Sequence, residues 1–181
     1  MDEMHGEGVE AAAFETLETA AVAADWDRSL RFLRLLAPYT ATLKQEPDRE
    51  ARQRLVIEAL CERWRTDPPA HPIIVAGSTA SRGATGLFMD AVSRLPQGAV
   101  VLPGFDADMP HGIWDKLANA RVPQDHPQTN IAKFLAVTGV PAADVQMWDA
   151  TAPAPARNAL VSLSLRPAPV TDQWLRDGPT L

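Results

Sequence analysis

Two short apolar runs, separated by one helix-length segment, constrain the fold of this chain more than any other feature. The first run, "PIIVAG", is β-branched and ends at Gly77, and the second, "VVLPG", ends at Gly104. Short continuous runs of this kind are typical of strands buried on both faces, which would place Val75 and Val101 in a packed core. The segment between them, "ATGLFMDAVSRL", has a helical pattern and is long enough for a crossover between parallel strands. The sequence therefore predicts a parallel β-α-β unit.

Helical patterns precede and follow this unit. The segment 1–67 reads as helical, and "PDREARQRL" predicts a helix start at Pro47 and Asp48, after which apolar side chains recur every four residues. The prolines of "TDPPAHP" end that helix. Further along, "HPQTNIAKFLAVTGV" and "APAPARNALVSLSL" predict helices, and the end of "PAADVQMW" suggests a short strand. We therefore expect an α/β fold with a helical segment over 1–67 and an α/β portion over 68–181.

The strand–turn–helix shape at 73–88 raises the question of phosphate binding. A Walker A loop has four residues between its glycines, followed by a lysine and a serine or threonine. Here five residues separate Gly77 from Gly83, and Ala84 stands where the lysine would be. A dinucleotide-binding GxGxxG pattern is also missing. The turn therefore lacks the residues that usually bind phosphate.

Two interpretations of this turn remain open. Its hydroxyl side chains and the N–H groups of the following helix could hold an anion, or the hydroxyls could cap the helix after a strand exit. The ligand candidates in the turn are Ser78, Thr79 and Arg82, with Ser81 beside them.

Asp106 and Asp108 directly follow the second apolar run, where α/β folds place ligand groups. An Asp-x-Asp loop could hold magnesium through carboxylate oxygens, but aspartates are also ordinary loop formers. His126 is either a general base or a residue that starts a helix. Cys61 is either a reactive thiol or a small apolar packing residue. The residue types alone do not decide between the two roles given for each of these residues.

Composition excludes several classes of protein. The chain has 181 residues and a net charge of −6, which disfavours autonomous nucleic-acid binding. Its single cysteine excludes internal disulfides and multi-cysteine metal sites. Charged residues interrupt each apolar run before the roughly 18 residues that a membrane span needs. The acidic N-terminus is unlike a signal peptide, so we expect a cytoplasmic protein without a membrane partner.

Three segments together carry a family resemblance, namely "HPIIVAGSTASRGATGLFMDAVSRLPQGAVVLPGFDADM", "HPQTNIAKFLAVTGV" and "ARNALVSLSLRPAPVTDQW". In this order, and at similar separation, they resemble the AddB subunit of alphaproteobacterial double-strand break repair helicase-nucleases. Gly77 to Thr79, Leu95 to Gly104 and His126 to Gln128 match the family words "AGSTGS", "LPQGAVVLPGLD" and "HPQ". The resemblance covers nearly the whole chain. It departs at Arg82 and Gly83, where the family tends to carry an aliphatic residue and proline.

The resemblance implies a piece of a longer protein related to ATP-dependent superfamily 1 helicases. An AddA-type helicase-nuclease subunit would supply the motor, and DNA would be bound by the full-length complex. The cluster cysteines and nuclease residues of full-length relatives are missing from these 181 residues. We therefore expect a non-catalytic, helicase-like scaffold of P-loop-derived type without a cofactor of its own. The alternative is a small stand-alone α/β enzyme or ligand-binding domain that uses the loops after strands 73–77 and 99–103.

Overall fold

The computed structural model forms two compact units, one comprising Met1–Pro68 and Arg82–Phe88 and the other comprising Pro69–Ser81 and Met89–Leu181. The first unit therefore includes a short segment beyond the predicted boundary after residue 67. The structure describes residues 6–9, 13, 28–29, 31–32, 34–35, 47–81, 83–119, 126–148, 154–166 and 171–180.

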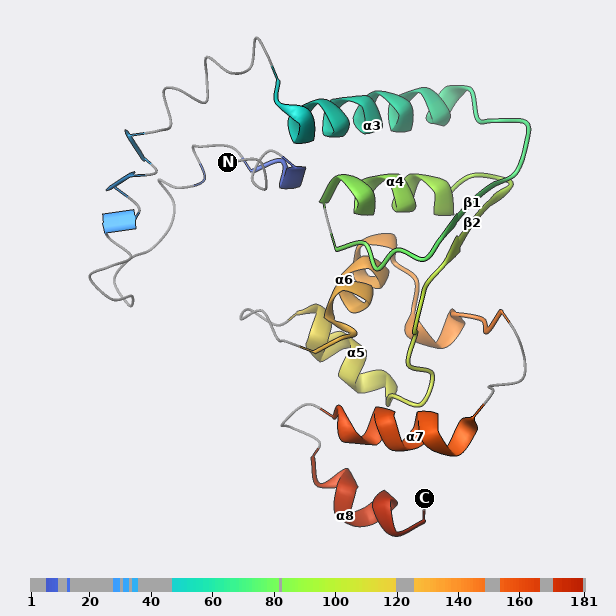
Figure 1. The fold of residues 1–181 in the computed structure, drawn as a ribbon. Helices are drawn as coiled ribbons and strands as arrows, with labels where there is room; N and C mark the ends of the chain where they lie inside the picture. Colours follow the sequence, from blue (N-terminus) through green and yellow to red (C-terminus); the bar gives the residue numbers. More distant parts are fainter. Residues whose placement is uncertain are drawn as a thin grey trace. The chain divides into compact units, whose positions relative to one another are not determined.

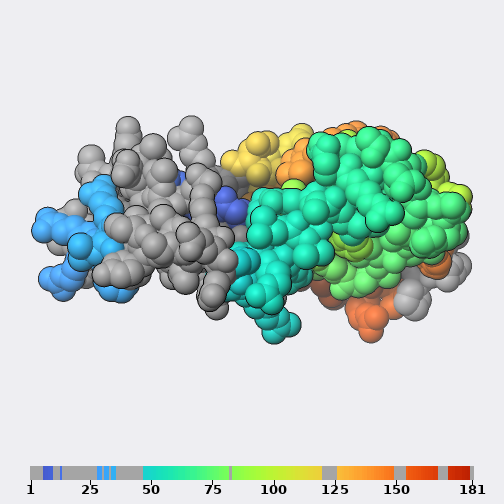
Figure 2. Space-filling model, turned by 90° about the horizontal axis from the view of Figure 1, so that it is seen from above, coloured from blue at the N-terminus to red at the C-terminus, as the bar shows by residue number. Residues whose placement is uncertain are grey.

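The main element of the first unit is helix α3, Arg49–Thr66. Asp48 is its N-cap, and one carboxylate oxygen accepts a hydrogen bond from the N–H of Ala51 at 2.7 Å. The predicted start of this helix is thereby confirmed. None of the residues of α3 is buried, and Figure 2 shows the atoms of this helix, in teal, at the surface.

The C-terminal half of α3 packs on residues that follow the turn. The ring centroids of Trp64 and Phe88 are 5.9 Å apart. The thiol of Cys61 is half-buried and lies 3.9 Å from the carbonyl oxygen of Leu87. Earlier in the unit, the described residues among 28–35 are helical. Most of the predicted helical segment before Pro47 lies outside the described residues.

A parallel pair of strands, β1 (Ile73–Ala76) and β2 (Gly98–Val101), opens the second unit. Helix α4, Gly83–Ser93, connects them, and Figure 1 shows the strands side by side. The register places Ile73 opposite Gly98 and Ala76 opposite Val101. The predicted parallel β-α-β unit is therefore confirmed.

Close packing explains the glycine at the start of β2. A Cβ atom at Gly98 would overlap the carbonyl oxygen of Val92 in the last turns of α4. The N–H of Gly98 also donates to the carbonyl oxygen of Leu95 at 3.1 Å.

An ion pair lies at the same end of α4. The Arg94 guanidinium donates to the Asp90 carboxylate, and this hydrogen bond raises the pKa of Arg94.

The expectation that both strands are buried on both faces is wrong. Ile74 is 58% exposed, and exposure alternates along β1. Val75 in β1 and each residue of β2, including Val101, are only half-buried and lie outside the core. In the described part of the chain the sheet has two strands. An apolar run reports a preference for burial but not how many layers cover the strand, and here one side of β1 stays open.

The core of the second unit lies between α5 (His111–Ala118) and α6 (Thr129–Thr138). Helix α6 begins where predicted, after His126, and ends at Gly139, whose φ of 72° suits glycine. The buried core cluster consists of Met109, Ile113, Trp114, Leu117, Ile131, Ala132 and Leu135.

The remaining elements of this unit are short. The last residues of "PAADVQMW", for which a short strand was suggested, form no strand, and a 3-10 turn, η2 (Ala142–Asp144), precedes them. Helix α7, Pro155–Ser164, begins on a proline as predicted and packs on α8, Gln173–Asp177. The chain then forms a second 3-10 turn, η4, Gly178–Thr180. Among the described helices, none is long and apolar enough to cross a membrane.

Candidate functional site

The turn after β1 is stabilised by its own serine. The hydroxyl oxygen of Ser78 accepts the N–H of Ala80 at 3.2 Å, which satisfies a backbone donor within the turn. Thr79 is half-buried. Ala80 has a φ of 55°, a left-handed conformation that alanine rarely adopts. Arg82 lies outside the described residues. The Ser78 hydroxyl therefore shapes the turn.

The first N–H of α4 already has an anionic partner. The N–H of Gly83 donates to a carboxylate oxygen of Glu7 at 2.6 Å, and both residues belong to the first unit. Ala84, which stands where a Walker lysine would be, is 3% exposed. Because helix N-termini attract anions, the Glu7 carboxylate lies where a negative charge is favoured.

The loop after β2 is an Asx turn. One carboxylate oxygen of Asp106 accepts the N–H of Asp108 at 3.0 Å, and the Asp106 carbonyl accepts the N–H of Met109 at 3.3 Å. Across the described ranges, no group of three or more His, Cys, Asp or Glu side chains could hold a metal ion. The geometry supports the interpretation that these aspartates form the loop.

Two side chains from distant helical segments hold this loop. The amide nitrogen of Gln128, at the N-cap of α6, donates to the carbonyl oxygen of Gly104 at 2.8 Å. Beyond the end of α7, Nη2 of Arg166 donates to the carbonyl oxygen of Asp108 at 2.6 Å. Gln128 is 8% exposed, so its hydrogen bond forms in a largely dry environment. These two hydrogen bonds join the loop to the start of α6 and to the segment that follows α7.

Local sequence patterns contain only partial signals for these two hydrogen bonds. Gln128 lies in the word "HPQ", which marked a helix start but carried no expected role. The ring nitrogen Nδ1 of His126 accepts the N–H of Gln128 at 3.1 Å, which supports the helix-start reading of this histidine. Arg166 and Glu7 carried no local signal, because their partners are far away along the chain.

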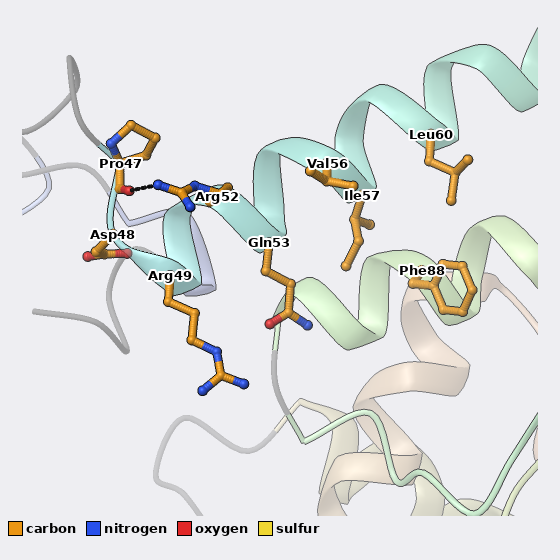
Figure 3. Close-up of a pocket in the computed structure, with 9 residues that line it drawn as sticks. All are labelled: Pro47, Asp48, Arg49, Arg52, Gln53, Val56, Ile57, Leu60 and Phe88. Carbon is orange, nitrogen blue, oxygen red and sulfur yellow. Dashed lines mark hydrogen bonds between the residues drawn. The ribbon is translucent and has the colours of Figure 1, made fainter.

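The first unit also contains an open pocket of about 680 Å³ along the N-terminal half of α3. Its floor is mainly aliphatic and aromatic, and two arginines stand at one end (Figure 3). The spacing of the apolar residues predicted an apolar face on α3, but it did not predict a pocket along that face. The lining residues are Pro47, Asp48, Arg49, Arg52, Gln53, Val56, Ile57, Leu60 and Phe88.

Three of the predicted ligand candidates, Ser78, Asp106 and Asp108, make hydrogen bonds within their own turns. The structure gives these residues contacts within their own loops, and none of them lines the pocket on α3. A scan against models of known protein families, a search of curated proteins and a search of solved structures each found no match for this chain.

Proposed function

We propose that this chain is a non-catalytic, helicase-like portion of an AddB-type subunit and that it serves DNA double-strand break repair as a scaffold. In the complete complex an AddA-type subunit supplies the motor activity, and DNA is bound by the assembled subunits. The support begins with the order of the segments that resemble the AddB family. Each of them falls on a structural element of the α/β unit: β1 and its turn, β2, α6 and α7.

The observation that carries the proposal is the hydrogen bond between Gln128 and Gly104. Gln128 belongs to the word "HPQ" and Gly104 ends the word "LPQGAVVLPG", so two separate parts of the resemblance bind each other at 2.8 Å. The hydrogen bond engages the amide nitrogen of Gln128 with the backbone of the loop after β2, so this group supports the fold from within. This contact supports an architectural role for both words.

The start of α4 supports the non-catalytic part of the proposal. Phosphate binding in P-loop proteins depends on a lysine and on free N–H groups at the helix start. Here Ala84 replaces the lysine, and the N–H of Gly83 is bonded to the Glu7 carboxylate. A polyphosphate would meet a like charge at this end of the helix.

Co-expression with an AddA-type subunit tests the proposal. We expect the chain to co-elute with that subunit in size-exclusion chromatography, and an acidic α/β protein of similar size to elute apart from it. An AddA-type subunit that elutes alone in the presence of excess chain would contradict the assignment.

The second candidate, a small ligand-binding α/β domain, is favoured by one observation. Ala80 holds a positive φ in the turn after β1, and strained backbone of this kind clusters at functional sites. If the turn binds a ligand, Ala80→Gly should raise stability by about 1 kcal/mol and weaken binding. Thermal shifts measured with a panel of small anions would reveal such a ligand in the parent chain.

A further inference from the structure

The pocket of about 680 Å³ on α3 is lined mainly by residues of that helix and forms an open groove. Its lining residues Arg49, Gln53, Val56 and Leu60 recur at steps of three and four along the helix, so they form one stripe. Phe88 closes the floor from the other side. Val56 is 61% exposed although it lines this groove, so an apolar surface is left open to water.

The charges at one end of the groove are unbalanced. Elsewhere on α3, Arg54 pairs with Glu58 and Arg65 pairs with Glu62. The groove arginines 49 and 52 form no ion pair among the described residues, and Arg52 reaches only the Pro47 carbonyl oxygen at 3.5 Å. The one carboxylate in the lining, that of Asp48, accepts the N–H of Ala51 as the helix cap.

We propose that this groove binds an amphipathic helix of a partner protein, with apolar side chains on the floor and an acidic side chain between Arg49 and Arg52. A helix fits because a stripe at three- and four-residue spacing packs best against a second stripe of the same kind. The acidic side chain follows from the guanidinium groups of Arg49 and Arg52, which form no ion pair in the part of the chain that the structure describes and which bind carboxylates with good geometry. This inference does not rest on the proposed repair function.

A pair of designed peptides tests the proposal on the full chain. Each is a fluorescent helix of about 15 residues with leucine at three- and four-residue spacing. One peptide carries glutamates flanking the apolar stripe and the other carries lysines at the same positions. We expect the acidic peptide to bind with a Kd near 10 μM and the basic peptide to bind at least about tenfold more weakly in anisotropy titrations.

Two variants identify the surface that binds. Replacing both Arg49→Glu and Arg52→Glu should reverse the preference, so that the basic peptide binds more tightly. Val56→Asp should abolish binding of both peptides while leaving the melting temperature within about 3 °C of the parent, because the side chain is largely exposed.

Three results would overturn the proposal. The first is equal affinity for both peptides, or binding that Val56→Asp does not change. The second is failure of both peptides to bind together with a large fall in melting temperature for Val56→Asp, which would mean that the chain itself fills the groove. The third is a dimer in sedimentation that Val56→Asp dissociates, which would mean that a second copy fills it.

Discussion

The rings of Phe105 and Trp114 are stacked, with their centroids 4.7 Å apart and their planes 11° apart. Phe105 belongs to the loop after β2, and Trp114 belongs to α5, so the stack joins the loop to the core. Trp114 is 5% exposed, whereas Trp148 in the same unit is 78% exposed. The two tryptophans therefore form a matched pair for measuring how much the core contributes to the free energy of unfolding.

Trp114→Ala should lower the free energy of unfolding by about 3–5 kcal/mol, because it removes a large buried side chain and leaves a cavity. Trp148→Ala should change it by less than about 0.5 kcal/mol. Urea unfolding followed by circular dichroism gives both values. Equal losses for the two variants would show that the core does not lie around α5.

Gln128 offers a test of the loop anchor. Its amide nitrogen donates to the carbonyl oxygen of Gly104, but its oxygen Oε1 is buried and has no hydrogen-bond partner within the described ranges. Gln128→Leu removes both groups and should cost about 1 kcal/mol. Gln128→Glu places a carboxylate against the Gly104 carbonyl and should cost about 2–4 kcal/mol at pH 7.

The two Gln128 variants should also differ in their response to pH. Burial beside a carbonyl raises the pKa of the introduced carboxyl above that of the unfolded chain, so the folded state binds the extra proton. The deficit of Gln128→Glu should therefore shrink as the pH falls from about 7 to about 4, while that of Gln128→Leu stays constant. Urea melts at both pH values check this, and a deficit that grows at low pH would contradict the buried position.

Local signals in the sequence predicted the secondary structure well. Asp48 capped α3, Pro155 started α7 and Gly139 ended α6, because caps and backbone conformation depend on neighbouring residues. The parallel pairing of β1 and β2 followed from the length of the crossover.

Contacts between distant residues could not be predicted in the same way. The carboxylate of Glu7 reaches Gly83, and Arg166 reaches Asp108, although long stretches of chain separate the partners. Nothing near Glu7 in the sequence distinguishes it from a solvated glutamate. For the same reason the exposure of Ile74 was mispredicted, since it depends on which element covers the sheet.

Magnesium–ATP should not bind this chain with a micromolar Kd. The missing lysine at Ala84 leaves phosphate charge without a cation, and the Glu7 carboxylate repels it. Glu7→Gln should leave ATP binding undetectable, because removal of the repulsion does not supply the lysine. Calorimetric titration measures both. A dissociation constant near 1 μM, which corresponds to a binding free energy of about −8 kcal/mol, would contradict the non-catalytic interpretation.

Asp106 should act as a turn former and not as a metal ligand or nuclease carboxylate. Asp106→Ala removes the acceptor for the Asp108 N–H and should cost about 1 kcal/mol, whereas Asp106→Asn keeps an oxygen there and should cost less. Magnesium should not shift the melting temperature of the parent chain, and linear DNA should stay intact. Cleavage or a magnesium-dependent shift that Asp106→Asn abolishes would mean that the aspartates hold a metal.

The final prediction compares the two strands. Val101 is half-buried at the end of β2, opposite Ala76, and its carbonyl accepts the N–H of Gly77 at 3.2 Å. Val101→Asp should therefore cost about 2–4 kcal/mol, because the carboxylate loses part of its hydration.

Ile74→Asp should cost less than about 1 kcal/mol, since Ile74 is 58% exposed and an introduced charge there stays hydrated. Urea melts of the two variants give the difference directly. If Ile74→Asp proved as damaging as Val101→Asp, the outer side of β1 would be covered in solution, and the original expectation of a strand buried on both faces would hold after all.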